Sequence, residues 1–113
     1  MPTLPKTPSL PDFQTYIVEM ETERGFITQN IVQKCLLLSE EVGELCKAIR
    51  HQDGMIVDAA LKETHAAHEC ADVLMILLSI ANRLNIDLEQ AFREKEALNK
   101  TRSWTKEKPP IAC

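Results

Sequence analysis

Two pairs of acidic residues have a spacing that brings their carboxylates together. Glu41 and Glu44 are three residues apart, as are Glu69 and Asp72, so in a helix both members of a pair lie on one face. The same faces continue into further residues of a packing seam: Leu37, Ala48 and His51 for the first pair, and Val73, Ile76 and Ile80 for the second. Carboxylates held together in an apolar seam repel one another and are driven towards protonation unless a cation compensates them.

A hard divalent cation is the best compensation for these carboxylates. Lys47 and Arg50 project to another side of the helix that carries Glu41 and Glu44. Four carboxylates on two facing helices supply the oxygen ligands that Mg²⁺ or Mn²⁺ prefers. A single E-x-x-E pair is usually a solvated helix face, but two pairs in apolar seams favour a metal site. Glu40, next to Glu41, has three roles open to it: ligand of a second metal, general base, or solvent-facing residue.

Composition narrows the class of protein. The chain has 113 residues, a net charge of −4 and 44% hydrophobic residues, which is typical of one soluble domain. We expect no basic surface that binds nucleic acid polymers, so affinity for polyanions would have to come from a local cluster or a bound metal. No apolar run approaches the ~18 residues of a membrane span, and we expect no secretory signal. The cysteines form no C-x-x-C pair, so we expect reduced cysteines packed as small apolar residues in a cytoplasmic protein: Cys35, Cys46, Cys70 and Cys113.

The pattern of apolar residues predicts an all-α bundle of four helices. Prolines gather at the ends, so residues 1–11 should form a flexible arm, residues 12–104 the domain and residues 105–113 a tail. The helices should run from about residue 10 to Gly25, from 29 to 52, from 66 to 85 and from 88 to 102, with a short helix near residues 58–62. The N-caps predicted for the first, second and fourth helices are Ser9, Thr28 and Asp87, the last with Gln90 completing a capping box.

The third helix predicts subunit association. Val73 to Leu78 are six consecutive apolar residues, and a helix that is apolar all round is buried all round. A chain with few helices has little to surround it, and the alternative is a central helix covered by its own chain. We therefore expect a homo-oligomer, at least a dimer.

Taken together, these motifs resemble one family. Glu40-Glu41-Val42-Gly43-Glu44 followed by Glu69-Cys70-Ala71-Asp72 is similar to the E-E-x-x-E…E-x-x-D signature of the MazG-like nucleotide pyrophosphohydrolases, an all-α superfamily. The segment from Lys95 to Arg102 resembles the closing K-x-x-x-N-x-x-R segment of the family. The resemblance covers residues 13–104 and is closest to the small single-domain members.

The resemblance implies an activity and a set of site residues. The activity is Mg²⁺-dependent hydrolysis of (deoxy)nucleoside triphosphates to the monophosphate and pyrophosphate, in nucleotide pool cleansing or in control of the dNTP supply. The implied metal ligands are Glu41, Glu44, Glu69 and Asp72, with Glu40 or Glu41 activating water. The implied assembly is a dimer or a dimer of dimers, with sites often completed by a neighbouring subunit. A silent regulatory module and a purely structural oligomer are the competing functions.

The same resemblance predicts the residues that bind substrate. Lys95, Asn99, Lys100 and Arg102 would bind phosphate or sugar, although basic residues also suit an ordinary helix C-terminus. Phe26 lies where relatives have a base-stacking aromatic residue, and His51 lies where some have tryptophan. The alternatives are a core position for Phe26 and, for His51, a helix C-terminal position that the helix dipole favours. His65 and His68 form no H-E-x-x-H motif, so we expect them at the surface or behind the metal ligands.

Overall fold

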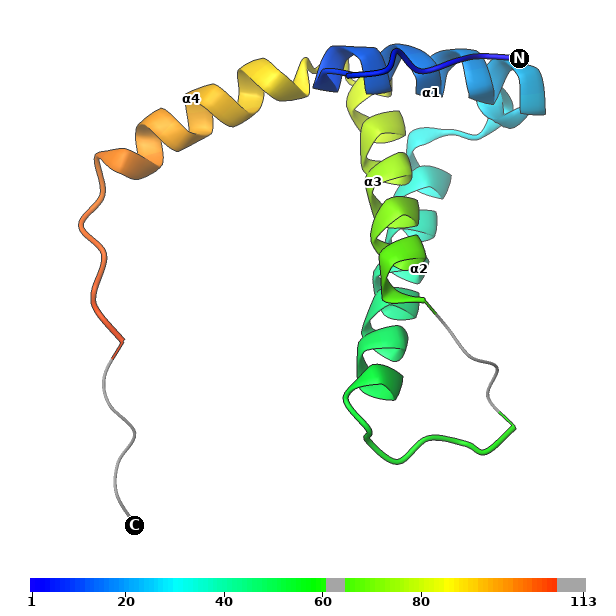
Figure 1. Ribbon diagram of the computed structural model, residues 1–113. Helices are drawn as coiled ribbons and strands as arrows, with labels where there is room; N and C mark the ends of the chain where they lie inside the picture. Colours follow the sequence, from blue (N-terminus) through cyan, green and yellow to red (C-terminus); the bar gives the residue numbers. More distant parts are fainter. Residues whose placement is uncertain (61–64, 108–113) are drawn as a thin grey trace.

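All regular structure in the described chain is helical, which confirms the all-α, four-helix prediction. The computed structural model describes residues 1–60 and 65–107. The elements are α1 (Leu10–Arg24), the 3-10 turn η1 (Phe26–Thr28), α2 (Ile31–Gln52), α3 (Ala66–Arg83) and α4 (Leu88–Lys100). Helices α2 and α3 form a long antiparallel hairpin, α1 crosses its upper end, and α4 extends away from that end as a separate arm (Figure 1). None of the described helices is both long and apolar enough to cross a membrane.

The ends of α1 follow the sequence closely. The Ser9 hydroxyl accepts from the backbone N–H of Asp12 at 3.3 Å, and the Asp12 carboxylate accepts from the N–H of Ser9 at 2.9 Å. Gly25 ends the helix with φ +77°, a left-handed conformation that glycine adopts without strain. Because α1 begins at Leu10, the last two residues of the predicted arm belong to this helix.

The predicted N-cap of α2 is wrong. Residues Phe26–Thr28 form η1, so Thr28 is part of that turn and Asn30 caps α2 instead. The Asn30 side chain accepts from the N–H of Gln33 at 2.9 Å, and the Gln33 side chain accepts from the N–H of Asn30 at 2.8 Å. Asp58–Ala60 form a turn, so the part of the predicted short helix that is described is not helical. Its remainder, residues 61–64, lies outside the described residues.

The junction between α3 and α4 differs from the prediction in detail. Helix α3 ends at Arg83 rather than at residue 85, because Asn85 has a left-handed φ of +55°. Asp87 caps α4 as predicted, accepting from the N–H of Gln90 at 3.2 Å. The Gln90 side chain donates to Glu94 at 3.0 Å, so the reciprocal capping box is not formed.

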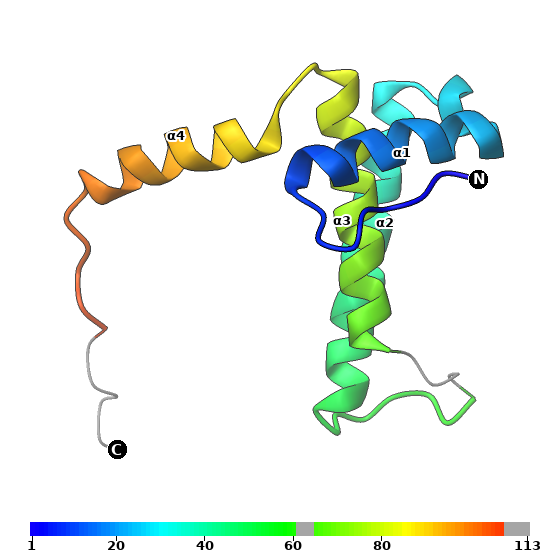
Figure 2. The same ribbon diagram turned by 45° about the horizontal axis from the view of Figure 1, so that its top comes forward.

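The core lies where α1 crosses α3. Ile17, Met20 and Leu78 are buried there, surrounded by the partly buried Phe13, Tyr16 and Leu88. Figure 2 shows α1 passing in front of the hairpin at this crossing. The core therefore fixes α1 against the end of the hairpin next to η1.

Gln14 connects three helices at the same end. Its amide nitrogen donates to the Asn82 side chain at 3.1 Å and to the Ile86 carbonyl at 2.7 Å. Its amide oxygen accepts from the backbone N–H of Leu88 at 3.0 Å, which satisfies one of the free N–H groups at the start of α4. Gln14 thus anchors the base of the α4 arm.

A single chain leaves much apolar surface uncovered. Leu74, Met75 and Leu77 on α3 are 39 to 42% exposed, and α4 has no buried residue. The radius of gyration is 18.2 Å, whereas a compact domain of ~100 residues has about 13 Å. The three described cysteines, Cys35, Cys46 and Cys70, are free and exposed, so the prediction that they pack in the interior is wrong for this chain; Cys113 lies outside the described residues.

Candidate active site

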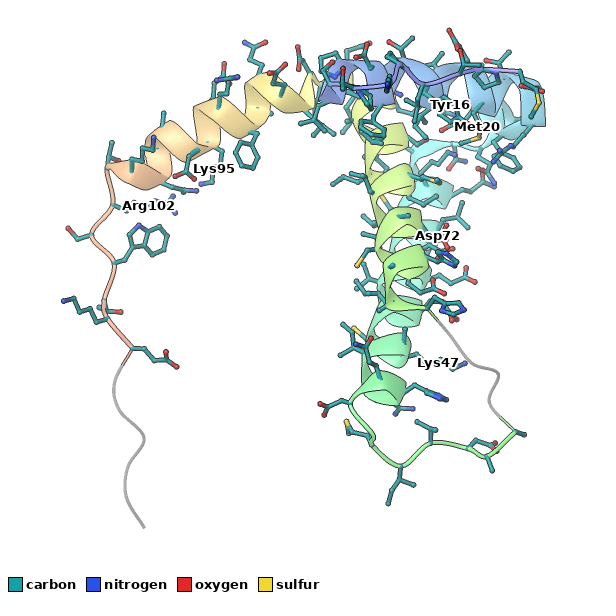
Figure 3. The ribbon with its side chains drawn as sticks, in the orientation of Figure 1. Tyr16, Met20, Lys47, Asp72, Lys95 and Arg102 are labelled. Atoms are coloured by element: carbon teal, nitrogen blue, oxygen red, sulfur yellow. The ribbon has the colours of Figure 1, made fainter. Side chains whose placement is uncertain are left out.

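Helices α2 and α3 bring three of the predicted ligands together. Oxygen atoms of Glu41, Glu69 and Asp72 all lie within 4.8 Å of one another. Figure 3 shows Asp72 midway along the hairpin. We call these three residues the carboxylate triad. Glu44, one turn further along α2, does not belong to the triad.

The triad is electrostatically strained without a cation. Burial raises the pKa of Glu41, and the negative charges of Asp72, Glu69, Glu40 and Glu44 raise it further, in that order. Four carboxylates therefore act on Glu41, and Glu44 is one of them. Hard oxygen donors at this separation fit a divalent cation such as Mg²⁺ or Mn²⁺.

A small cavity opens beside the triad. It has a volume of about 180 Å³ and is lined by residues of α1, η1, α2 and α3. Glu41 and Asp72 line it, so the cavity and the triad share two residues. Phe26 forms part of its wall and is 42% exposed, which places this predicted substrate-binding residue next to the carboxylates. Met20, Met75 and Ile76 supply apolar lining.

Lys34 and Glu21, which line the cavity, belong to a charge network with Arg83 that the sequence motifs did not indicate. The Lys34 ammonium lies 3.5 Å from Glu21 Oε1, and Arg83 lies 3.3 Å from Glu21 Oε2. Lys34 is only 2% exposed and Glu21 only 6%. A signal was present, since Lys34 precedes Glu41 by seven residues and therefore shares its helix face.

Arg83 holds the turn before α2 in place. Its guanidinium donates to the backbone carbonyls of Gln29 at 2.6 Å, Ile27 at 3.2 Å and Phe26 at 3.3 Å. These bonds fix η1, and therefore Phe26, at the edge of the cavity.

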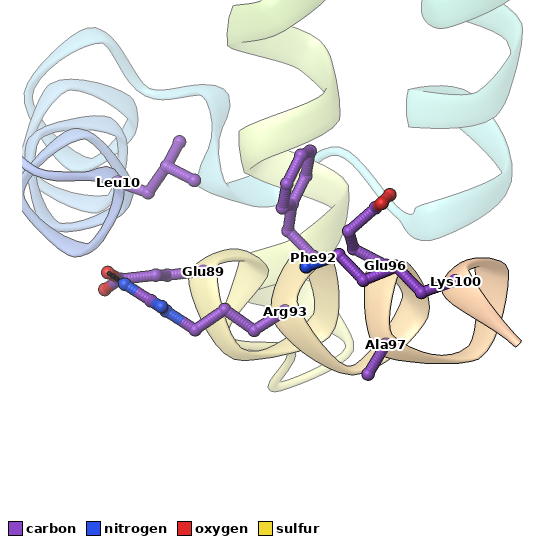
Figure 4. A pocket seen from close by; sticks show the side chains of 7 residues that line it. All are labelled: Leu10, Glu89, Phe92, Arg93, Glu96, Ala97 and Lys100. Carbon is purple, nitrogen blue, oxygen red and sulfur yellow. Dashed lines mark hydrogen bonds and ion pairs between the residues drawn. The ribbon is translucent and has the colours of Figure 1, made fainter.

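The basic residues of α4 lie away from the triad. Figure 3 shows Lys95 and Arg102 on the α4 arm, and Asp72 on the hairpin. Lys95 and Asn99 line a hollow of about 400 Å³ together with apolar residues of α3 and α4. Lys100 lines a neighbouring hollow of about 460 Å³ between α4 and Leu10 (Figure 4). One chain therefore does not bring these predicted phosphate ligands to its own carboxylates.

The other predicted residues lie around the hairpin. Glu40 is exposed beside a shallow hollow of about 280 Å³. His51 lies ten residues after Glu41, about 15 Å along α2, and its buried Nδ1 has no partner among the described residues. His65 and His68 are exposed, with ring centroids 5.1 Å apart, which confirms their expected surface position. Trp104 follows α4 and donates to the Asn99 carbonyl at 3.3 Å.

Comparison with known proteins identifies relatives of this arrangement. The chain matches the MazG nucleotide pyrophosphohydrolase domain over residues 29–105, which is more than half of its length. It is 36% identical over 69 residues to the dATP/dGTP diphosphohydrolase of cyanophage S-2L, covering 61% of this chain and 53% of that protein. It is 38% identical over 55 residues to YpjD of Bacillus subtilis, covering 48% and 50% respectively. The chain thus spans about half the length of the curated relatives it matches.

Two crystal structures have a similar fold. YpjD from Bacillus subtilis superposes with a TM-score of 0.75 at 25% identity, covering 88% of this chain and 100% of that one. The Bacillus-conserved MazG protein, a nucleotide pyrophosphohydrolase, superposes with a TM-score of 0.66 at 26% identity, covering 90% and 98%. The domain match includes the triad and the basic segment of α4. The chain belongs to the MazG nucleotide pyrophosphohydrolase domain family.

Proposed function

We propose that this chain hydrolyses (deoxy)nucleoside triphosphates to nucleoside monophosphate and pyrophosphate in a Mg²⁺-dependent reaction. The observation that carries the proposal is the triad of Glu41, Glu69 and Asp72 beside a small, partly apolar cavity. Membership of the MazG family supports the same reaction. Because a triphosphate is itself an anion, an acidic site needs a cation to bind it.

Each carboxylate has a role in this proposal. Glu41, Glu69 and Asp72 would hold Mg²⁺, or Mn²⁺ in its place, with Glu44 as a further ligand. The metal, when bound, supplies positive charge that neutralises phosphate oxygens and polarises the attacked phosphorus. Glu40 or Glu41 would orient the attacking water and accept its proton.

The cavity beside the triad is the proposed place of the nucleobase. Phe26 at its edge offers a ring face for stacking. The cyanophage relative is a dATP/dGTP diphosphohydrolase, so purine deoxynucleotides are the first substrates to test. His51 lies outside this cavity, and its part in binding stays a prediction.

We propose a homo-oligomer, a dimer or a dimer of dimers, in which α4 of one copy reaches the triad of another. Two features support it. The apolar faces of α3 and α4 are open in a single chain. Lys95, Asn99, Lys100 and Arg102 lie on an arm that extends away from the hairpin of their own chain (Figure 3). In a second copy they would supply positive charge to the phosphates.

A kinetic screen tests the proposed reaction. Pyrophosphate release is measured with Mg²⁺ across canonical and modified ribo- and deoxyribonucleoside triphosphates. We expect release from at least one of them, lost in the presence of EDTA. Absence of pyrophosphate release from the whole panel, with Mg²⁺ or Mn²⁺, would contradict the proposal.

A further inference from the structure

We propose that Lys34 and Ser79 select nucleobases that present a carbonyl oxygen, such as hypoxanthine and guanine, over bases that present an amino group at the same position. This inference rests on the proposed function, because it takes the cavity beside the triad as the nucleobase site. It assigns a specificity to two residues that no sequence motif singled out. The observations that carry it are the burial of both side chains and the hydrogen-bonding capacity left to them.

Besides Glu41 and Asp72 of the triad, the polar residues that line the cavity are Glu21, Arg24, Lys34 and Ser79. Glu21 Oε1 faces Lys34 at 3.5 Å, and Glu21 Oε2 faces Arg83, which is not among the lining residues, at 3.3 Å. Arg83 in turn donates to the backbone carbonyls of the η1 turn. The network of Glu21, Lys34 and Arg83 carries two positive charges and one negative charge, so it favours a ligand atom with partial negative charge next to Lys34.

Lys34 has donors to spare. An ammonium group has three N–H donors and no acceptor, and the ion pair that the described residues give it is with Glu21. The ammonium also lies 6.0 Å from the centroid of the Phe26 ring. A base stacked on that face of Phe26 would therefore lie close to the Lys34 ammonium.

Ser79 supplies the second polar group. It is 2% exposed, it lines the cavity, and its hydroxyl has no hydrogen-bond partner among the described residues. A buried hydroxyl without a partner is costly, and a ligand atom in the cavity would remove that cost. The hydroxyl lies on α3, seven residues after Asp72, just as Lys34 lies on α2 seven residues before Glu41. Both groups are therefore about two helical turns from the triad, at the same end of the cavity.

The size of the cavity suits a single heterocycle. Its volume of about 180 Å³ is below the ~300 Å³ at which pockets begin to hold drug-sized ligands. With the phosphates at Glu41 and Asp72, the base would point along the cavity towards Lys34 and Ser79. An amino group placed there would meet an ammonium donor, whereas a carbonyl oxygen would accept from it.

A comparison of dITP with dATP tests the inference directly. Hypoxanthine has a carbonyl oxygen and an N1–H group where adenine has an amino group and an unprotonated N1, and the two bases are otherwise the same. For the wild-type chain with Mg²⁺, we expect kcat/KM for dITP to exceed that for dATP by about tenfold or more. Lys34→Met should bring the ratio to within about threefold of unity, mainly by raising KM for dITP. Ser79→Ala should lower the ratio by a smaller factor, and because its hydroxyl has no partner this variant should fold normally.

Lys47→Met is the matched control, since it removes the same charge from α2 outside the cavity. It should leave the ratio unchanged, and Mn²⁺ binding measured by electron paramagnetic resonance should be the same in all variants. A wild-type ratio at or below unity would overturn the inference. The inference would also be overturned if Lys34→Met lowered kcat/KM equally for dITP and dATP while Ser79→Ala left the ratio unchanged. That result would indicate that Lys34 has a structural role only.

The inference and the proposed function can fail separately. If the wild type hydrolyses no triphosphate, the proposed function is wrong, and the preference is then measured as binding of dITP and dATP by calorimetry with Mg²⁺. Tighter binding of dITP that is lost in Lys34→Met would support the inference alone. Equal binding of the two nucleotides, or no binding of either, would overturn it.

Discussion

Lys34 and Glu41 line the same cavity from the same face of α2, seven residues and about 10 Å apart along the helix axis. Lys34 is buried against Glu21, and Glu41 belongs to the carboxylate triad. The cavity is therefore acidic at the end where a cation fits and holds the ion pair of Lys34 and Glu21 at the end where a base would lie. This polarity gives a nucleotide one direction in which to bind.

The triad should be essential for turnover. Removing any one ligand charge should lower kcat by about 1,000-fold or more, because the charge of the metal stabilises the transition state by several kcal/mol. The four variants are Glu41→Gln, Glu44→Gln, Glu69→Gln and Asp72→Asn. Helix content, measured by circular dichroism, should not change. If two of the four variants keep nearly wild-type activity, the site is wrongly placed. The metal-free variants should melt at the wild-type temperature or above it, since repulsion in the triad falls.

The raised pKa of Glu41 predicts how stability depends on pH without metal. In the unfolded chain this carboxyl ionises at its ordinary value of 4.5, but in the folded protein it stays protonated to higher pH. The free energy of unfolding in EDTA should therefore fall as pH rises from below 4.5 through the raised pKa, and then level off. Urea unfolding of wild type and Glu41→Gln, from about pH 4 to pH 8, measures the difference. If the difference in the free energy of unfolding between wild type and Glu41→Gln did not depend on pH, the raised pKa of Glu41 would be contradicted.

Mg²⁺ should oppose this loss of stability. A protonated carboxyl cannot bind the metal, so the increase in melting temperature caused by Mg²⁺ should grow as pH rises through the pKa of Glu41. Thermal unfolding with and without Mg²⁺, at a series of pH values, measures this increase in melting temperature. No Mg²⁺-induced shift at any pH would favour a purely structural role for the acidic residues.

Subunit association should be required for activity. Light scattering should show at least a dimer, and a tetramer is expected. Phe92→Glu places a charge on the exposed apolar face of α4 and should give an inactive monomer. A mixture of the inactive Glu69→Gln and Lys95→Ala/Arg102→Ala chains should regain activity if one copy supplies the triad and another supplies α4. An active wild-type monomer, or no recovery in a mixture proven to exchange subunits, would contradict the shared site.

The basic residues of α4 should act on phosphate and not on metal. Lys95→Ala and Arg102→Ala should each lower kcat/KM for triphosphates by about one to two orders of magnitude, since a charge-assisted contact contributes about 1.5–3 kcal/mol. Mn²⁺ binding without nucleotide should be unchanged. Unchanged kinetics in both variants would make this segment an ordinary helix C-terminus.

The sequence was sufficient to predict the helices and most of the carboxylate cluster. Spacing alone placed Glu41, Glu69 and Asp72 on facing helix surfaces, and the structure brings them within 4.8 Å of one another. Local capping chemistry located the N-caps of α1 and α4. These features depend on residues a few positions apart, where helical geometry leaves little freedom.

The sequence did not reveal what depends on distant contacts. The cap at Thr28 was wrong because η1 is fixed by Arg83, which is more than fifty residues away. Lys34 looks like a surface lysine until α1 places Glu21 beside it. In the same way, neither the buried hydroxyl of Ser79 nor the separation of Lys95 from the triad can be read from helical periodicity.

The most direct test of the proposed reaction follows oxygen from water into the products. The wild-type chain with Mg²⁺ is given its best triphosphate substrate in water labelled with oxygen-18, and the products are analysed by mass spectrometry. Attack at the α-phosphorus predicts one labelled oxygen in the nucleoside monophosphate, unlabelled pyrophosphate, and equal amounts of the two. Label in pyrophosphate would contradict attack at the α-phosphorus. Orthophosphate formed before pyrophosphate, in a preparation free of inorganic pyrophosphatase, would contradict the proposed pyrophosphohydrolase activity.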